Sequence, residues 1–141
     1  MKFFISTAII ALAHVVAACD EAQRFGILTV SPTTVRAGDT INLNTDLRCA
    51  AELGINPIFL DYSIENLVNN NGFELPLLLA RRAIPAGAQS DSFTTTVPHG
   101  FFDAGANYSV VINTVYPLKG SDGSQIIQEG GTDTPINIVV N

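Results

Sequence analysis

The segment Gly105–Tyr116, which reads GANYSVVINTVY, contains the longest run of β-forming residues in the chain. After Asn107 it is rich in valine, isoleucine, threonine and tyrosine, whose branched or aromatic side chains fit the pleated surface of a sheet. Gly105 marks a turn directly before this run. We therefore predict a strand over Asn107–Tyr116 that is entered through a turn.

Shorter segments on both sides repeat this pattern. After residue 26, apolar side chains recur at every second position, and the spacing of an amphipathic helix is almost absent. Seven or eight short strands separated by turn signals predict a single all-β domain with the architecture of a β-sandwich. The other predicted strands are Gly26–Ser31, Thr40–Thr45, Ile58–Glu65, Phe73–Arg82, Ser90–Val97, Ser124–Gln128 and Pro135–Val140.

Two turn signals divide the predicted strands. Asn69-Asn70-Asn71-Gly72 supplies residues that adopt positive φ angles, as a tight hairpin requires. We therefore expect the strands on either side of it to pair with each other. Gly130-Gly131 indicates another turn, between the last two strands.

Tyr108 occupies a distinctive position at the start of the longest strand. In Greek-key sandwiches a tyrosine at this point often forms a tyrosine corner, in which its hydroxyl hydrogen-bonds to backbone a few residues upstream. The pattern resembles that of immunoglobulin and fibronectin type III domains. It implies an immunoglobulin-like Greek-key sandwich, and it gives Tyr108 a structural role.

The first eighteen residues have the features of a secretory signal peptide. Lys2 provides a positive start, the stretch 3–18 is apolar with few interruptions, and Ala17-Ala18 forms a small-residue cleavage site. We predict cleavage after Ala18, which leaves residues 19–141 as one secreted, extracellular domain. An alternative is a bacterial-type lipid anchor, because Val-Ala-Ala-Cys resembles the motif that directs lipidation of Cys19.

The two cysteines, Cys19 and Cys49, are predicted to form a disulfide. Secretion exposes the chain to an oxidising compartment, where paired cysteines persist. The bridge would close a loop of about thirty residues and stabilise the fold by about 3–4 kcal/mol in the chain-entropy model. This pairing requires that cleavage leave Cys19 in the product and that Cys19 not be lipidated.

The net charge argues against several classes of partner. Without residues 1–18 the chain has six basic residues against thirteen acidic ones, a net charge near −7. Such a surface repels nucleic acid, and no polybasic cluster is present to hold an anionic membrane. No second apolar stretch predicts a membrane span, and the C-terminal sequence lacks the pattern of a GPI signal.

His99 is the one histidine outside the predicted signal peptide, and it lies in a predicted loop. Nucleophilic catalysis requires a base beside the nucleophile, and no G-x-S-x-G turn accompanies His99. A zinc site needs several cysteine or histidine ligands, and the disulfide leaves none to join it. We therefore expect no enzyme activity, metal or cofactor; a small hydrolase that uses a buried His99 is the alternative.

The loop after His99 also contains the aromatic pair Phe101 and Phe102, and with His99 it forms the candidate binding site. Exposed loop aromatics often anchor a ligand. Burial under the end of the sandwich is the alternative for this pair. Asn107-Tyr108-Ser109 is an N-glycosylation sequon, so Asn107 is a candidate glycan site in a eukaryotic secretory route.

Several motifs in order resemble a family of small secreted fungal proteins. They are Phe25–Pro32, the Ala37-Gly38-Asp39 turn, the Asn107–Val110 strand and the closing Ile-x-Ile strand. Together they are similar to the immunoglobulin-like N-terminal domain of Ser/Thr-rich, often GPI-anchored, fungal cell-wall proteins linked to β-glucan assembly. The chain lacks the Ser/Thr-rich tail and the tryptophan after the second strand.

The resemblance implies a non-catalytic binding module whose partner is a cell-wall polysaccharide or an extracellular protein. A structural wall component without a specific ligand is the alternative. Exposed Phe101 and Phe102 would favour the binding module over the structural component.

Overall fold

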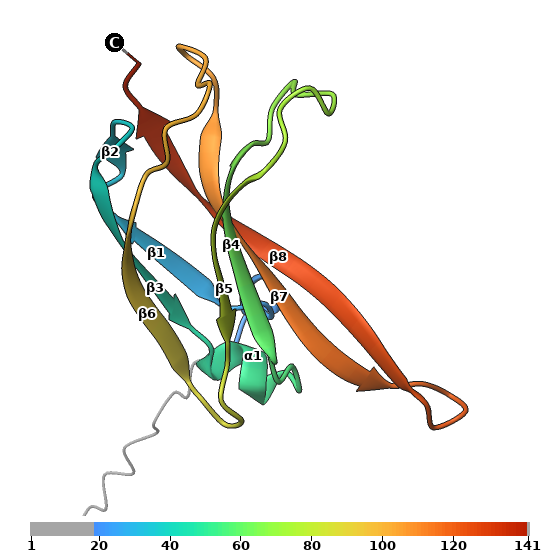
Figure 1. The fold of residues 1–141 in the computed structure, drawn as a ribbon. Coiled ribbons are helices and arrows are strands. Elements are labelled where there is room, and N and C mark those ends of the chain that lie inside the picture. Colours follow the sequence, from blue (N-terminus) through green and yellow to red (C-terminus); the bar gives the residue numbers. More distant parts are fainter. Residues whose placement is uncertain (1–18, 141) are drawn as a thin grey trace, which may run out of the picture.

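The computed structural model describes residues 19–140, which form eight strands and two short helical segments (Figure 1). The predicted signal peptide, residues 1–18, lies outside the described residues. The elements are η1 (Glu21–Gln23), β1 (Ile27–Ser31), β2 (Thr34–Val35), β3 (Thr40–Asp46), α1 (Arg48–Glu52), β4 (Phe59–Asn66), β5 (Leu77–Ala83), β6 (Ser90–Thr96), β7 (Tyr108–Lys119) and β8 (Gln125–Ile138).

The strands form two sheets that pack face to face. One sheet has the order β1-β3-β6, and the other has the order β2-β8-β7-β4-β5, in which β2 runs parallel to β8 and the other neighbours are antiparallel. The chain crosses between the sheets after β1, β2, β3, β5 and β6. These crossings confirm the predicted all-β, immunoglobulin-like β-sandwich.

The core lies between the sheets and follows the period-two pattern of the sequence. Alternate residues of β3 and β4, including Ile41, Leu43, Leu60 and Tyr62, are almost completely buried. Their neighbours in β3 face solvent. Burial of one face of each strand therefore supplies the main hydrophobic stabilisation of the fold.

A buried polar network joins the two sheets around Tyr62. The hydroxyl of Tyr62 donates to Asp91 Oδ2 (3.1 Å) on β6, and it accepts from Thr45 Oγ1 (2.8 Å) on β3. Arg82 Nε on β5 donates to the same Asp91 carboxylate at 2.7 Å. The ring of Phe93 packs edge-on against Tyr62. The network satisfies the polar groups that this part of the core contains.

The β4–β5 pairing is confirmed, but the connection is longer than a tight hairpin. Residues 67–76 form a ten-residue loop, and β5 begins at Leu77 rather than at Phe73. Asn69, Asn71 and Gly72 adopt positive φ angles inside this loop. Pro76 therefore ends the loop instead of lying within the strand.

The predicted turn at Gly130-Gly131 is wrong, because both glycines lie inside the continuous strand β8. A Cβ atom on Gly130 would collide with the ring of Phe25, and one on Gly131 would lie 2.7 Å from the Ile112 carbonyl oxygen. Glycine is thus required here for close packing rather than for chain reversal. The reversal lies instead at residues 120–124.

The short helix α1 was not predicted. Its five residues are too few to show a helical period, and it follows β3 almost directly. Ala50 of α1 packs with Ile55, Tyr116 and Phe25 in a second apolar cluster. The predicted disulfide between Cys19 and Cys49 is confirmed, and it attaches the start of the described chain to α1.

Candidate functional site

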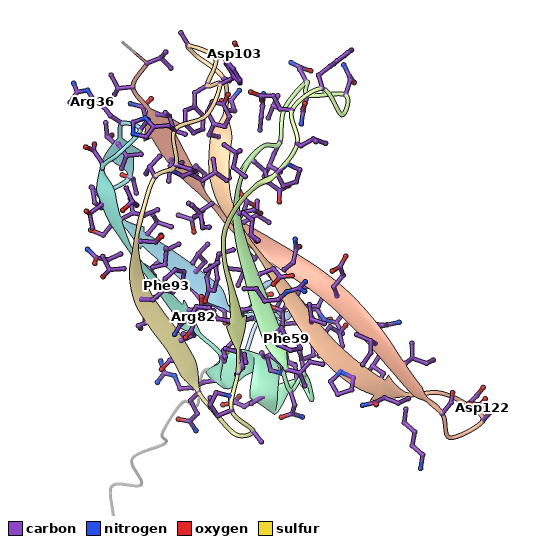
Figure 2. All side chains as sticks on the ribbon, viewed as in Figure 1. Arg36, Phe59, Arg82, Phe93, Asp103 and Asp122 are labelled. Atoms are coloured by element: carbon purple, nitrogen blue, oxygen red, sulfur yellow. A yellow bond between two sulfur atoms is a disulfide. The ribbon has the colours of Figure 1, made fainter. Side chains whose placement is uncertain are left out.

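Two long loops meet at the end of the sandwich opposite α1 (Figure 1). One is the β4–β5 loop, residues 67–76, and the other is the β6–β7 loop, residues 97–107. Figure 2 shows Asp103 of the β6–β7 loop at this end, far from Asp122 at the tip of the β7–β8 hairpin. Loops at the end of a rigid sandwich are a common location for binding sites.

The β4–β5 loop is held in shape by Asn70. Its side-chain amide donates to the Glu74 carbonyl oxygen at 2.7 Å, and its Oδ1 accepts from the Glu74 N–H at 2.6 Å. The Phe73 N–H also donates to the Asn70 carbonyl oxygen. The two hydrogen bonds between Asn70 and the Glu74 backbone close the loop and turn Phe73 and Leu75 outward, where both are exposed.

The hydroxyl of Tyr108 joins the two loops. It accepts a hydrogen bond from the Asp103 N–H at 2.9 Å, which confirms the predicted tyrosine corner, and it donates to Glu74 Oε1 at 2.6 Å. Glu74 Oε2 accepts from Asn66 Nδ2 at 2.7 Å. Burial raises the pKa of Tyr108, and the hydrogen bond to Glu74 raises it further. Tyr108 therefore remains a neutral donor at ordinary pH.

A groove of about 280 Å³ lies between the two loops, and we name it the loop groove. Three of its apolar side chains stand far out in solvent: Phe101 is fully exposed, Phe73 is 89% exposed and Leu75 is 80% exposed. The residues that line the groove are Ile64, Asn66, Phe73, Glu74, Leu75, Leu77, Phe101, Phe102 and Tyr108.

Phe101 and Phe102 have different environments although they are neighbours in sequence. Phe102 is half-buried, packs against the core and meets the Tyr108 ring edge-on at 5.3 Å between centroids. Phe101 points into solvent and contributes nothing to the core. Of the two alternatives for this pair, exposure holds for Phe101 and partial burial holds for Phe102.

His99 does not line the loop groove; it lies at a different place on the surface. There it lines a second groove, of about 420 Å³, together with Arg36 and Asp39. Within residues 19–140 no hydrogen bond joins His99 to a carboxylate or a hydroxyl. His99 is itself exposed in this structure, whereas the hydrolase alternative requires a buried histidine.

The sequence did not reveal the contribution of the β4–β5 loop to the groove. A tight hairpin at Asn71-Gly72 predicts a strand that begins at Phe73 and so includes Phe73 and Leu75, but β5 begins only at Leu77. The available signal was the run of three asparagines before Gly72 and the proline at position 76, which together leave little room for a strand.

The remaining predicted site residue is Asn107, the neighbour of Tyr108 at the start of β7. Asn107 is exposed directly before β7, and its glycosylation stays a prediction. Among the described residues, no three histidine, cysteine, aspartate or glutamate side chains gather as metal ligands would. No helix of the described part is long and apolar enough to cross a membrane.

Comparison with known proteins gives matches among solved structures alone. No family model matches it, and no curated protein matches it. Among solved structures it is similar to superoxide reductase (neelaredoxin) from Ignicoccus hospitalis. One substituted variant of that protein has 12% sequence identity, a TM-score of 0.47 and 84% coverage of each chain. A second structure of this superoxide reductase has 12% identity, a TM-score of 0.40, and coverage of 79% of this chain and 80% of that one. A likeness at this level says nothing about activity.

Replacement of Tyr108 by phenylalanine should lower the free energy of unfolding by about 1–2 kcal/mol. The variant keeps the ring but removes the hydroxyl that bonds to Asp103 and Glu74, so an N–H and a carboxylate oxygen each lose a partner. Denaturant unfolding followed by circular dichroism measures the change. Tyr116→Phe is the matched control, because the Tyr116 hydroxyl has no protein partner within residues 19–140; equal losses in both variants would contradict a tyrosine corner.

Proposed function

We propose that the chain is a secreted, non-catalytic binding module that holds an apolar segment of an extracellular protein in the loop groove. The exposure of Phe101, Phe73 and Leu75 around one groove is the observation that carries this proposal. Leaving three large apolar side chains in water at one place is unfavourable unless a partner covers them. A structural component without a ligand would have no use for such a cluster.

The polar groups of the groove favour an apolar partner over a polysaccharide. Glu74 already accepts hydrogen bonds from Tyr108 and Asn66, and the Tyr108 hydroxyl already has two partners. Sugar hydroxyls need free donors and acceptors beside the aromatic surface, and these groups are committed within the protein. The unoccupied surface is formed by phenylalanine and leucine side chains, which match the aliphatic and aromatic residues of a peptide.

The scaffold beneath the groove suits binding without large rearrangement. Tyr108 fixes the β6–β7 loop to Glu74, and Asn70 fixes the β4–β5 loop around the same residue. Because these hydrogen bonds set the loop shapes before a partner arrives, little conformational entropy is lost on binding. The polypeptide ligand would therefore meet preformed aromatic anchors.

The test is selection of peptides from a random-sequence library on the protein purified from a secretory expression host. We expect enriched peptides to contain aromatic and aliphatic residues. Replacement of Phe101 by alanine should weaken their binding about 10–100-fold, since a buried phenylalanine is worth about 1.5–3 kcal/mol. Leu75→Ser should weaken it as well, whereas Leu78→Ser should not, because Leu78 is exposed on β5 but does not line the groove.

A parallel measurement distinguishes a polysaccharide ligand from a peptide ligand. The same protein is incubated with insoluble β-glucan, chitin and whole fungal walls, and the retained fraction is measured with and without Phe101→Ala. Saturable retention that the substitution abolishes would replace the peptide ligand by a polysaccharide. Peptide binding that is insensitive to both Phe101→Ala and Leu75→Ser would remove the loop groove from the proposal.

A further inference from the structure

The hairpin of β7 and β8 extends well beyond the sandwich (Figure 1). β4 pairs with β7 only up to Val115, whereas β7 and β8 continue to pair as far as Lys119 and Gln125. We name the two-stranded part, residues 116–128, the arm. Leu118, Ile126 and Ile127 are exposed on it. An isolated two-stranded ribbon is only marginally stable in water, so a further contact would stabilise the exposed part of the arm.

The outer edge of β8 is open along most of its length. β2 pairs with β8 only at Asn137 and Ile138, and no other described strand pairs with this edge. The Asn137 N–H donates to the Thr33 carbonyl oxygen beside β2. The odd-numbered residues of β8 therefore direct their N–H and C=O groups outward, away from β7. We name this outward row the open edge; it consists of Gln125, Ile127, Glu129, Gly131 and Asp133, all of which are exposed.

The open edge has only part of the usual protection against pairing, the charges of Glu129 and Asp133. Natural edge strands are commonly short, or they carry charged side chains, proline or a bulge. β8 has fourteen residues, its pairing with β7 is in continuous register, and no lysine or proline occurs between Gln125 and Thr134. Its unpaired backbone groups therefore remain available to another strand.

We propose that the partner of the open edge is a second copy of this chain, in an antiparallel β8–β8 pair centred on Gly130. A two-fold axis at Gly130 places Glu129 opposite Gly131 of the partner subunit and Ile127 opposite Asp133 of the partner subunit. Four such residue pairs then exchange about eight backbone hydrogen bonds. The two five-stranded sheets become one continuous sheet.

Repulsion between acidic side chains favours this register over those centred one residue earlier or later. A pairing centred on Glu129 would set the two Glu129 carboxylates directly opposite each other, and one centred on Gly131 would oppose Glu129 and Asp133. Like charges directly opposite each other destabilise a strand pair. A centre at Gly130 avoids both arrangements, and it lays each arm along residues 132–135 of the other copy. The arm thereby gains the third strand that it lacks.

The dimer goes beyond the proposed function and does not depend on it. The arm and the loop groove project from different parts of the molecule, as the positions of Asp122 and Asp103 in Figure 2 show. Pairing through β8 would leave both loop grooves open. One assembly would then present two binding sites, which raises the apparent affinity for a partner that can engage both.

Sedimentation equilibrium of the purified secreted protein tests the dimer. We expect a mass twice that of the chain at high concentration. Asp133→Pro should yield a monomer, because it removes one outward N–H. The odd-numbered positions of β8 accept proline within the fold, as Pro135 shows, because their N–H groups point away from β7. Asp133→Ala is the matched control and should remain dimeric. Unchanged circular dichroism of Asp133→Pro excludes unfolding as the cause.

A cross-linking variant tests the register independently. In the proposed pair Gln128 lies opposite Thr132 of the partner subunit, with Cα atoms about 4.5 Å apart, a separation that a disulfide spans. Gln128→Cys/Thr132→Cys should therefore form a covalent dimer on mild oxidation, whereas the two cysteines of one chain are about 13 Å apart and cannot join. A monomeric wild type at all concentrations, a dimeric Asp133→Pro, or a double-cysteine variant without covalent dimer would each overturn the proposal.

Discussion

Removal of the Cys19–Cys49 disulfide is expected to lower the free energy of unfolding by about 3–4 kcal/mol. The bridge joins residues 30 positions apart and restricts the unfolded chain accordingly. It also holds α1 beside the first described residues, close to where Ala50, Ile55, Phe25 and Tyr116 pack together. Because small domains have a stability of about 5–15 kcal/mol, this loss is a large fraction of the total.

Cys19→Ser/Cys49→Ser and the wild type in reducing agent should show the same loss, since both lack the covalent link. Denaturant unfolding monitored by circular dichroism compares them with the oxidised wild type. Mass spectrometry of the secreted product supplies the control, because it reports whether the chain begins at Cys19 and whether that residue is lipidated. Equal stability of oxidised and reduced protein would contradict a stabilising bridge.

Replacement of Asp91 by alanine is expected to cost about 2–3 kcal/mol. Asp91 accepts from the Tyr62 hydroxyl and from Arg82, and its side chain is only 9% exposed. The substitution leaves the Tyr62 hydroxyl with Thr45 alone and leaves the Arg82 guanidinium, whose side chain is 38% exposed, without its carboxylate. Loss of a partner in a largely buried network costs more than loss of a surface ion pair.

Two further variants separate burial from charge. Asp91→Asn keeps an acceptor for Tyr62 and should lose about half as much as Asp91→Ala. Asp61→Ala removes the ion pair with Arg81 on the outer face of the sheet, where Arg81 is 64% exposed, and should cost about 0–1 kcal/mol. If Asp61→Ala and Asp91→Ala lowered unfolding free energies equally, the network around Tyr62 would have no special role.

The tyrosine corner connects stability with the proposed binding. Tyr108 is placed by the fold, as in other Greek-key sandwiches, but its second hydrogen bond reaches Glu74 in the β4–β5 loop. That bond fixes the loop from which Phe73 and Leu75 project. Tyr108→Phe should therefore reduce peptide binding somewhat in addition to its effect on unfolding, although Tyr108 itself is buried.

The class of fold and its main internal links could be predicted from the amino-acid sequence. Alternation over Thr40–Thr45 predicted a half-buried strand correctly, because a strand between core and solvent exposes every second side chain. Over Ile58–Glu65 it predicted a strand correctly, but Ser63 and Ile64 are both buried there. Two cysteines in a chain with a predicted export signal implied one bridge. A tyrosine after a glycine turn implied a corner. Each of these inferences depends on local spacing or on a count of residues.

The set of residues that gather at the loop groove and the course of β8 depend on packing between distant parts of the chain. Phe73 and Phe101 are 28 positions apart, and they meet because the β4–β5 and β6–β7 loops lie at the same end of the sandwich. Gly130-Gly131 indicated a turn locally, but the Phe25 ring occupies the space above Gly130, which only a glycine within a continuous strand leaves free. Strand order, register and packing across the sheets place these groups, and a one-dimensional pattern of burial contains none of that information.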